Sequence, residues 1–170
     1  MIVTLIFLLF PICLVLAALT DLLEMTIPNH IPLALILGFL VVAPFIDIGW
    51  TGFGWHLAAG AVVFAACFAL FAFGVMGGGD AKLLSAAALW FGFNESLLSF
   101  AIYVSYIGGL LTVLLILLRS RSSIVMTLNL PLPDSLISAK KVPYGIAIGI
   151  AGLIAYQDSP IVLWALSAGK

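Results

Sequence analysis

Residues 1–21 of the chain are MIVTLIFLLFPICLVLAALTD, an apolar run in which the first charged side chain is Asp21. A helix that crosses the hydrocarbon core of a bilayer needs about 20 predominantly apolar residues. The run therefore predicts a transmembrane helix over residues 1–20 that stops at Asp21. No Lys or Arg precedes the apolar core, whereas a secretory signal peptide begins with a basic region, so we expect this helix to be retained.

The composition extends this interpretation to the whole chain. Of the 170 residues, 65% are hydrophobic and 8% are charged, whereas a soluble domain has about 25% charged residues. Six Lys and Arg against seven Asp and Glu give a formal charge of −1, which excludes a basic surface for nucleic acid. Cys13 and Cys67 lack CxxC or Cys/His spacing, so we expect them to pack or to face lipid rather than to form a disulfide or a zinc site.

Further apolar runs follow the first, and together they predict an all-α, polytopic membrane protein with about six transmembrane helices in one domain. The predicted helices, two of them short, are residues 1–20, 31–48, 56–75, 81–93, 97–118 and 142–156. We expect residues 161–167 to lie in the outer interface. Asp158 in mid-membrane would cost about 2.5–3.5 kcal/mol, and Pro160 would remove a helix donor.

The basic residues predict the orientation of these helices. The connections after the first, third and fifth helices contain five of the six basic residues, namely Lys82, Arg119, Arg121, Lys140 and Lys141, and the other side has only Lys170. Loops rich in Lys and Arg face the cytoplasm. The count therefore predicts that both chain termini lie outside.

Two acids share the predicted cytoplasmic side. Asp21 closes the first helix, and Asp80 opens the fourth directly after Gly77, Gly78 and Gly79. Glycine tolerates positive φ and close approach, so this turn could press Asp80 against a neighbouring helix. Two carboxyl groups within hydrogen-bond reach share one proton. The ionised member could then take a proton from water while the other donates to a peptide carbonyl, without a metal, a cofactor or a covalent intermediate.

A structural interpretation of each acid stands beside this one. Asp80 fits the N-cap of the helix that follows it, where the helix dipole stabilises a negative charge. Asp21 could mark the point at which the first helix leaves the bilayer. Their shared side and the glycine run favour the catalytic pair.

Three segments resemble the type IV prepilin peptidases. Gly77-Gly78-Gly79-Asp80 matches a GxGD motif and continues through Ala81-Lys82-Leu83 like the second catalytic segment of that family. Thr20-Asp21 followed by Ile27-Pro28-Asn29 is similar to the first catalytic segment. Val142-Pro143-Tyr144-Gly145-Ile146-Ala147 resembles the opening of the last helix of the family.

The resemblance implies a membrane-embedded aspartic endopeptidase with the GxGD fold. Its catalytic pair would be Asp21 and Asp80, and it would remove the basic leader of prepilins or pseudopilins at the cytoplasmic face of the bacterial inner membrane. Larger family members carry an N-terminal segment with paired CxxC motifs and also methylate the pilin. This chain has no such motifs, so it resembles the short, peptidase-only type of tight-adherence (Flp-type) pili, and methylation stays open.

Residues near the two acids are expected to shape the site. Pro28 stops the first helix and Asn29 caps the second, while Pro143 and Gly145 suit a helix start. Tyr144 could present its hydroxyl to the aspartates or anchor at the interface, and we favour the anchor.

The two charged neighbours of the pair have different expected roles. Lys82 lies two residues past Asp80, on another face of the helix, so we expect it to reach lipid phosphate. Glu24 could attract the basic leader if the first helix continues past the membrane, although a solvated loop acid is the more common case.

The remaining polar and aromatic residues give weaker signals. His30 and His56 fall on opposite predicted sides, so they cannot share a metal. The segment 119–141 is long enough to cover the site or to guide the substrate. We expect the tryptophans to lie in the outer aromatic belt, namely Trp50, Trp55, Trp90 and Trp164.

Two other classes of function compete with a peptidase. A small transporter or channel would have acids near mid-membrane and internal repeats, whereas here the acids lie at helix ends and no repeat is evident. A non-enzymatic component of a pilus or secretion assembly would use its polar residues only to hold helices together. In that case Asn would replace Asp21 and Asp80 without loss.

Overall fold

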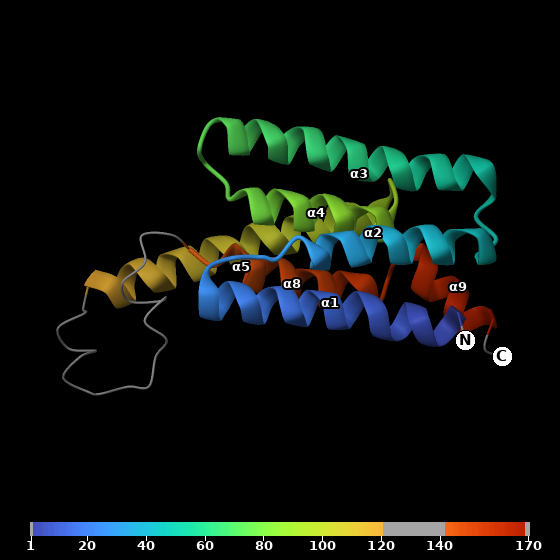
Figure 1. The fold of residues 1–170 in the computed structure, drawn as a ribbon, viewed down its shortest axis with the longest axis horizontal. Helices are drawn as coiled ribbons and strands as arrows, with labels where there is room; N and C mark the ends of the chain where they lie inside the picture. Colours follow the sequence, from blue (N-terminus) through green and yellow to red (C-terminus); the bar gives the residue numbers. More distant parts are fainter. Residues whose placement is uncertain (1, 121–141, 169–170) are drawn as a thin grey trace.

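The computed structural model describes residues 2–120 and 142–168, and all of its regular structure is helical (Figure 1). The prediction of an all-α protein is confirmed for this part of the chain. The helices are α1 (Ile2–Glu24), α2 (His30–Val42), the 3-10 helix η1 (Ala43–Phe45), α3 (Gly49–Ala72), α4 (Gly78–Phe91), α5 (Glu95–Ser120), α8 (Tyr144–Tyr156) and α9 (Pro160–Ala168).

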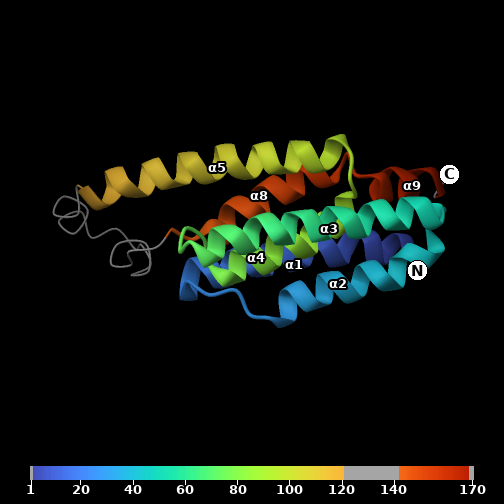
Figure 2. The same cartoon turned by 90° about the horizontal axis from the view of Figure 1, so that it is seen from above.

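Helices α1 to α5 and α8 lie side by side and alternate in direction along the chain, and α9 continues from α8 after a bend (Figures 1 and 2). The end of α1 and the starts of α4 and α8 meet at one end of the bundle, and the two chain termini lie at the other end. Segments that are distant in sequence therefore share one end. A helix pairs its backbone donors and acceptors internally, as a span through lipid requires.

Among the described residues, three helices, α1, α3 and α5, are long and apolar enough to cross a membrane. The pair α8 and α9 gives a fourth span if the two helices, bent by 44° at their junction, are counted as one. The shorter α2 is also apolar. Six crossings therefore stay a prediction, as does the interfacial position of residues 161–167, although Ile161, Val162 and Ala165 are buried against the bundle.

Several predicted helix boundaries are wrong. The second helix ends at Val42, with η1 as far as Phe45, rather than at residue 48, α3 ends at Ala72 rather than at residue 75, and α4 begins at Gly78 rather than at residue 81. Helix α1 continues three residues past Asp21, to Glu24. Helix α3 begins at Gly49 rather than at His56, although its first residues include several glycines and tryptophans. Phe53 stacks on Phe39 of α2 with ring centroids 6.0 Å apart. This tertiary contact favours helix where local propensity does not.

Trp90 lies in the core, so its predicted position in the aromatic belt is wrong. Its side chain is 0% exposed and lies 5.5 Å from the ring of Phe10 and 6.1 Å from that of Tyr156. Its Nε1–H donates to Leu35 O at 3.0 Å. The indole thus joins α1, α2, α4 and α8. Trp50 and Trp55 are exposed near the start of α3, and their place in the belt stays a prediction.

Helix α8 presents glycines to α1. A Cβ at Gly149 would lie 3.1 Å from Ala18 Cβ, and one at Gly152 would lie 2.5 Å from Leu14 Cδ1. In lipid no hydrophobic effect drives helices together, so close packing must hold them to one another. Small residues allow the two backbones to approach closely enough for this packing. The glycine face of α8 therefore sets how near α8 comes to α1.

Other buried polar side chains join pairs of helices by hydrogen bonds. Tyr156 donates its hydroxyl hydrogen to Ile6 O at 3.0 Å, and His56 Nδ1 donates to Leu89 O at 2.7 Å. Cys13 and Cys67 are buried, so they pack rather than face lipid. The two hydrogen bonds tie α8 to α1 and α3 to α4.

The residues on which the predicted orientation depends are described only in part. The first turns of α4, with Lys82, and the last turn of α5, with Arg119, lie at the same end of the bundle (Figure 1). Arg121, Lys140, Lys141 and Lys170 lie outside the described residues. The direction of the bundle in the membrane stays a prediction.

Trp90→Ala is expected to lower the free energy of unfolding by about 3–5 kcal/mol, because it leaves a cavity among four helices. Trp90→Phe should cost less but still lose the hydrogen bond to Leu35. Denaturation in detergent micelles would measure both. Trp55→Ala is the control, since Trp55 is 55% exposed. An equal loss of stability in the control would contradict this role of Trp90.

Candidate active site

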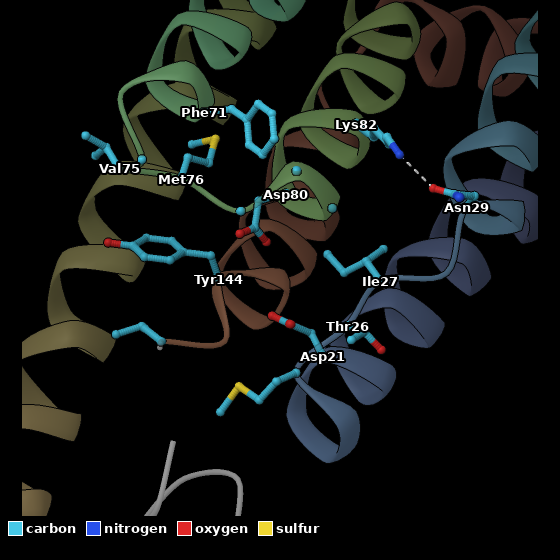
Figure 3. Close-up of a pocket in the computed structure, with 16 residues that line it drawn as sticks. Asp21, Thr26, Ile27, Asn29, Phe71, Val75, Met76, Asp80, Lys82 and Tyr144 are labelled. Atoms are coloured by element: carbon cyan, nitrogen blue, oxygen red, sulfur yellow. Dashed lines mark hydrogen bonds between the residues drawn. The ribbon is translucent and has the colours of Figure 1, made fainter. Parts of the chain in front are cut away.

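A cleft of about 760 Å³ opens where α1, α3, α4 and α8 meet. Asp21 and Asp80 both line it, and their carboxyl groups point into the same space from different helices (Figure 3). The structure thus brings the two acids to one site. The lining residues are Asp21, Met25, Thr26, Ile27, Asn29, Phe71, Gly74, Val75, Met76, Gly77, Gly78, Gly79, Asp80, Lys82, Val142 and Tyr144.

Asp21 lies in the last turn of α1 and is 6% exposed. Its Oδ2 accepts a hydrogen bond from Gly145 N at 2.6 Å. Gly145 is the second residue of α8, and the first N–H groups of a helix have no partner within the helix. The buried carboxyl therefore receives a backbone donor that the helix itself does not use.

Gly145 is required for this contact because the backbones of α1 and α8 are close. A Cβ at position 145 would lie 2.8 Å from both Cβ and Oδ2 of Asp21. Any larger residue would displace the carboxyl or move the helix. The predicted helix start at Pro143 and Gly145 is confirmed, with Pro143 as the N-cap of α8.

Asp80 is the third residue of α4, and the N-cap of that helix is Gly77. The interpretation of Asp80 as the N-cap is therefore wrong. Asp80 still lies in the first turn, where the helix dipole favours a negative charge. Unlike Asp21 it is only partly buried, so it forms the more open wall of the cleft.

The glycines before Asp80 act through their small size. Gly77 has φ −72° and ψ 143°, and none of Gly77, Gly78 and Gly79 has a positive φ. A Cβ at Gly79 would lie 3.2 Å from Ile27 Cβ, and one at Gly78 would lie 3.3 Å from Phe71 Cε2. The expectation of close approach is correct, and the expectation that they supply positive φ is wrong.

Positive φ occurs one turn earlier, at Gly74 (φ +73°). Gly74 ends α3, where Val75 N donates to Leu70 O at 2.9 Å in the pattern of a Schellman motif. Sequence reasoning missed Gly74. A glycine directly after a long apolar run is the usual mark of a helix C-terminus, and this signal could have identified it.

Lys82 and Asn29 are joined, which corrects the prediction that Lys82 reaches lipid phosphate. Lys82 Nζ donates to Asn29 Oδ1 at 2.9 Å (Figure 3). Asn29 is the N-cap of α2, as predicted, but its side chain makes no capping hydrogen bond. Its oxygen instead ties the α1–α2 connection, which contains Pro28, to the first turns of α4.

Tyr144 lines the cleft with its ring, but its hydroxyl lies 3.2 Å from Thr112 Oγ1 of α5. The prediction that this hydroxyl could point at the aspartates is wrong. The favoured alternative, an anchor at the membrane interface, stays a prediction, and the hydroxyl contact joins α8 to α5.

Glu24 ends α1 as an exposed residue and is not among the residues that line the cleft. Its predicted contact with a basic leader therefore stays a prediction. Of the segment 119–141, proposed to cover the site, residues 121–141 lie outside the described part.

The other residues that sequence reasoning missed are mostly apolar. Met25 has φ +54°, the single positive φ of a non-glycine residue in the described ranges, and its N–H donates to Asp21 O at 3.0 Å. Thr26, Phe71, Val75, Met76 and Val142 complete the wall. Their residue types alone carry no functional signal in so apolar a chain. Within residues 2–120 and 142–168, no three His, Cys, Asp or Glu side chains gather as a metal site.

A comparison with protein families matches most of the chain. The model of the type IV leader peptidase family matches residues 8–118, a range that contains Asp21 and Asp80 and covers more than half of the chain. Comparisons with curated proteins and with solved structures gave no match. On the strength of the family match, the chain belongs to the type IV leader peptidase family, the family of the prepilin peptidases.

Proposed function

We propose that the chain is a membrane-embedded aspartic endopeptidase with Asp21 and Asp80 as its catalytic pair. It removes the basic leader of type IV prepilins or pseudopilins, of the Flp type, at the cytoplasmic face of the inner membrane. The observation that carries the proposal is that two carboxyl groups 59 positions apart line one cleft at one end of an apolar bundle. Family membership supports the reaction class.

The geometry suggests how the pair would act on a peptide bond. Oδ2 of Asp21 accepts one hydrogen bond from Gly145 N–H, and the carboxyl group has further lone pairs with which it can bind a water molecule in the cleft. One carboxylate takes a proton from this water as its oxygen attacks the carbonyl carbon, and the protonated partner donates to the carbonyl oxygen. Collapse of the tetrahedral intermediate breaks the C–N bond, and the amine leaves with a proton from the pair.

The proposed substrate suits the position of the cleft. Under the orientation that the basic residues predict, the cleft lies at the inner boundary of the membrane. A basic leader stays cytoplasmic, and the apolar helix after it lies in the bilayer, so the scissile bond reaches this boundary. The fold then consists of one transmembrane peptidase domain with six crossings and both termini outside.

Asp21→Asn and Asp80→Asn are each expected to slow leader removal by at least about 100-fold, because Asn keeps the shape of the side chain but cannot exchange a proton. The test is to co-express each variant with a Flp-type prepilin and to follow leader loss by gel mobility at equal membrane abundance. Asp47→Asn is the matched control, since Asp47 is an exposed acid outside the cleft. Normal processing by both cleft variants would show that the catalytic assignment is wrong.

Lys82→Met and Asn29→Leu are each expected to slow processing by about 5-fold, the loss expected of one hydrogen bond. The double variant should be little worse than either single variant, because both remove the same interaction. Rates of leader loss for the two single variants and the double variant complete the cycle. Fully additive effects would contradict a functional link between the two side chains.

A further inference from the structure

Two neighbouring glycines of α5 have opposite surroundings. A Cβ at Gly108 would lie 2.8 Å from Cε1 and 3.2 Å from Cδ1 of Tyr144, whereas a Cβ at Gly109 would have nothing within 4 Å. Gly108 is buried and Gly109 is exposed. Only the absence of a side chain at position 108 lets the ring of Tyr144 lie against the backbone of α5.

A chain of two hydrogen bonds holds the same ring at its far end. Thr112 Oγ1 donates to Gly108 O at 2.7 Å, and a threonine hydroxyl has a single hydrogen. In the 3.2 Å contact between the two hydroxyls, the donor is therefore Tyr144. Gly108 and Thr112 thus fix the ring of Tyr144 by shape and by a directed hydrogen bond.

Tyr144 is linked to the candidate catalytic acid through one peptide unit. The N–H that donates to Asp21 Oδ2 at 2.6 Å belongs to Gly145, and the same planar unit contains the carbonyl group of Tyr144. A Cβ at Gly145 would lie 2.8 Å from Asp21, so the first turn of α8 has little room to move toward α1. A displacement of Tyr144 on the α5 side therefore changes the hydrogen bond to Asp21.

We propose that Gly108 and Thr112 are positioning residues, which hold Tyr144 so that the first turn of α8 keeps the Gly145 N–H on Asp21. Neither residue lines the cleft. The inference rests on the proposed function for its effect on rate. The geometric part of the inference is that contacts with α5 maintain the hydrogen bond from Gly145 N–H to Asp21. This part does not depend on which reaction the cleft performs.

The test compares Gly108→Ala with Gly109→Ala in the full chain in membranes. Both substitutions raise helix propensity equally, by about 1 kcal/mol, so the difference between them reports the contact with Tyr144. With a Flp-type prepilin as substrate, Gly108→Ala should slow leader removal by about 10-fold, the loss of a strong hydrogen bond. Gly109→Ala should stay within about 2-fold, the size expected of a surface substitution.

A second pair of variants separates positioning from general packing. Thr112→Ser keeps the hydroxyl and should process like the wild type, whereas Thr112→Val keeps the volume, loses the hydroxyl and should be slowed. If Gly108→Ala does not accumulate in membranes, this pair alone decides. If Asp21→Asn abolishes processing, equal rates for Thr112→Ser and Thr112→Val would overturn the proposal.

The infrared band of Asp21 gives a readout that does not depend on catalysis. The difference spectrum between wild type and Asp21→Asn isolates the carboxyl band. That band should shift in Gly108→Ala and Thr112→Val but not in Gly109→Ala and Thr112→Ser. An unshifted band in all four variants would overturn the inference. If the band shifts but Asp21→Asn processes normally, the positioning inference stands and the proposed function is wrong.

Discussion

The hydrogen bond from Gly145 N–H to Asp21 is the interaction on which the rest of the cleft depends. A buried carboxyl group without a donor is costly, and here the donor is the open end of a helix. The contact needs glycine at position 145 and a close approach of α8 to α1, which Gly149 and Gly152 permit. Packing along the whole length of α8 therefore serves one polar contact at its start.

Polar contacts between helices decide the geometry of this apolar molecule. In lipid the apolar surfaces of helices gain little by meeting one another, so small residues and hydrogen bonds determine which helices touch. The hydrogen bond from Lys82 to Asn29 joins α4 to the start of α2. The one from Trp90 to Leu35 joins the same two helices deeper in the bundle. The one between Tyr144 and Thr112 joins α8 to α5.

What the sequence could predict follows from which signals are local. Apolar runs predicted the helices because span length is a local property, and the rarity of charge singled out Asp21 and Asp80. Trp90 and the partner of Lys82 depend on residues more than 50 positions away, and the start of α3 depends on a contact with α2, so no local pattern reports them. The glycines before Asp80 were identified partly because glycine tolerates positive φ, whereas the structure requires their small size. That requirement comes from the side chains of Ile27 and Phe71, which leave no room for a Cβ.

The distance along the chain between Asp21 and Gly145 has a consequence for biosynthesis. Asp21 lies in the last turn of α1, and its backbone donor is made 124 residues later. A nascent chain that has inserted only α1 to α5 contains both Asp21 and Asp80. It lacks the hydrogen bond to Asp21 that Gly145 of α8 donates in the complete cleft. The cleft is thus completed only once α8 has been made, and products truncated before α8 lack the geometry of the finished site.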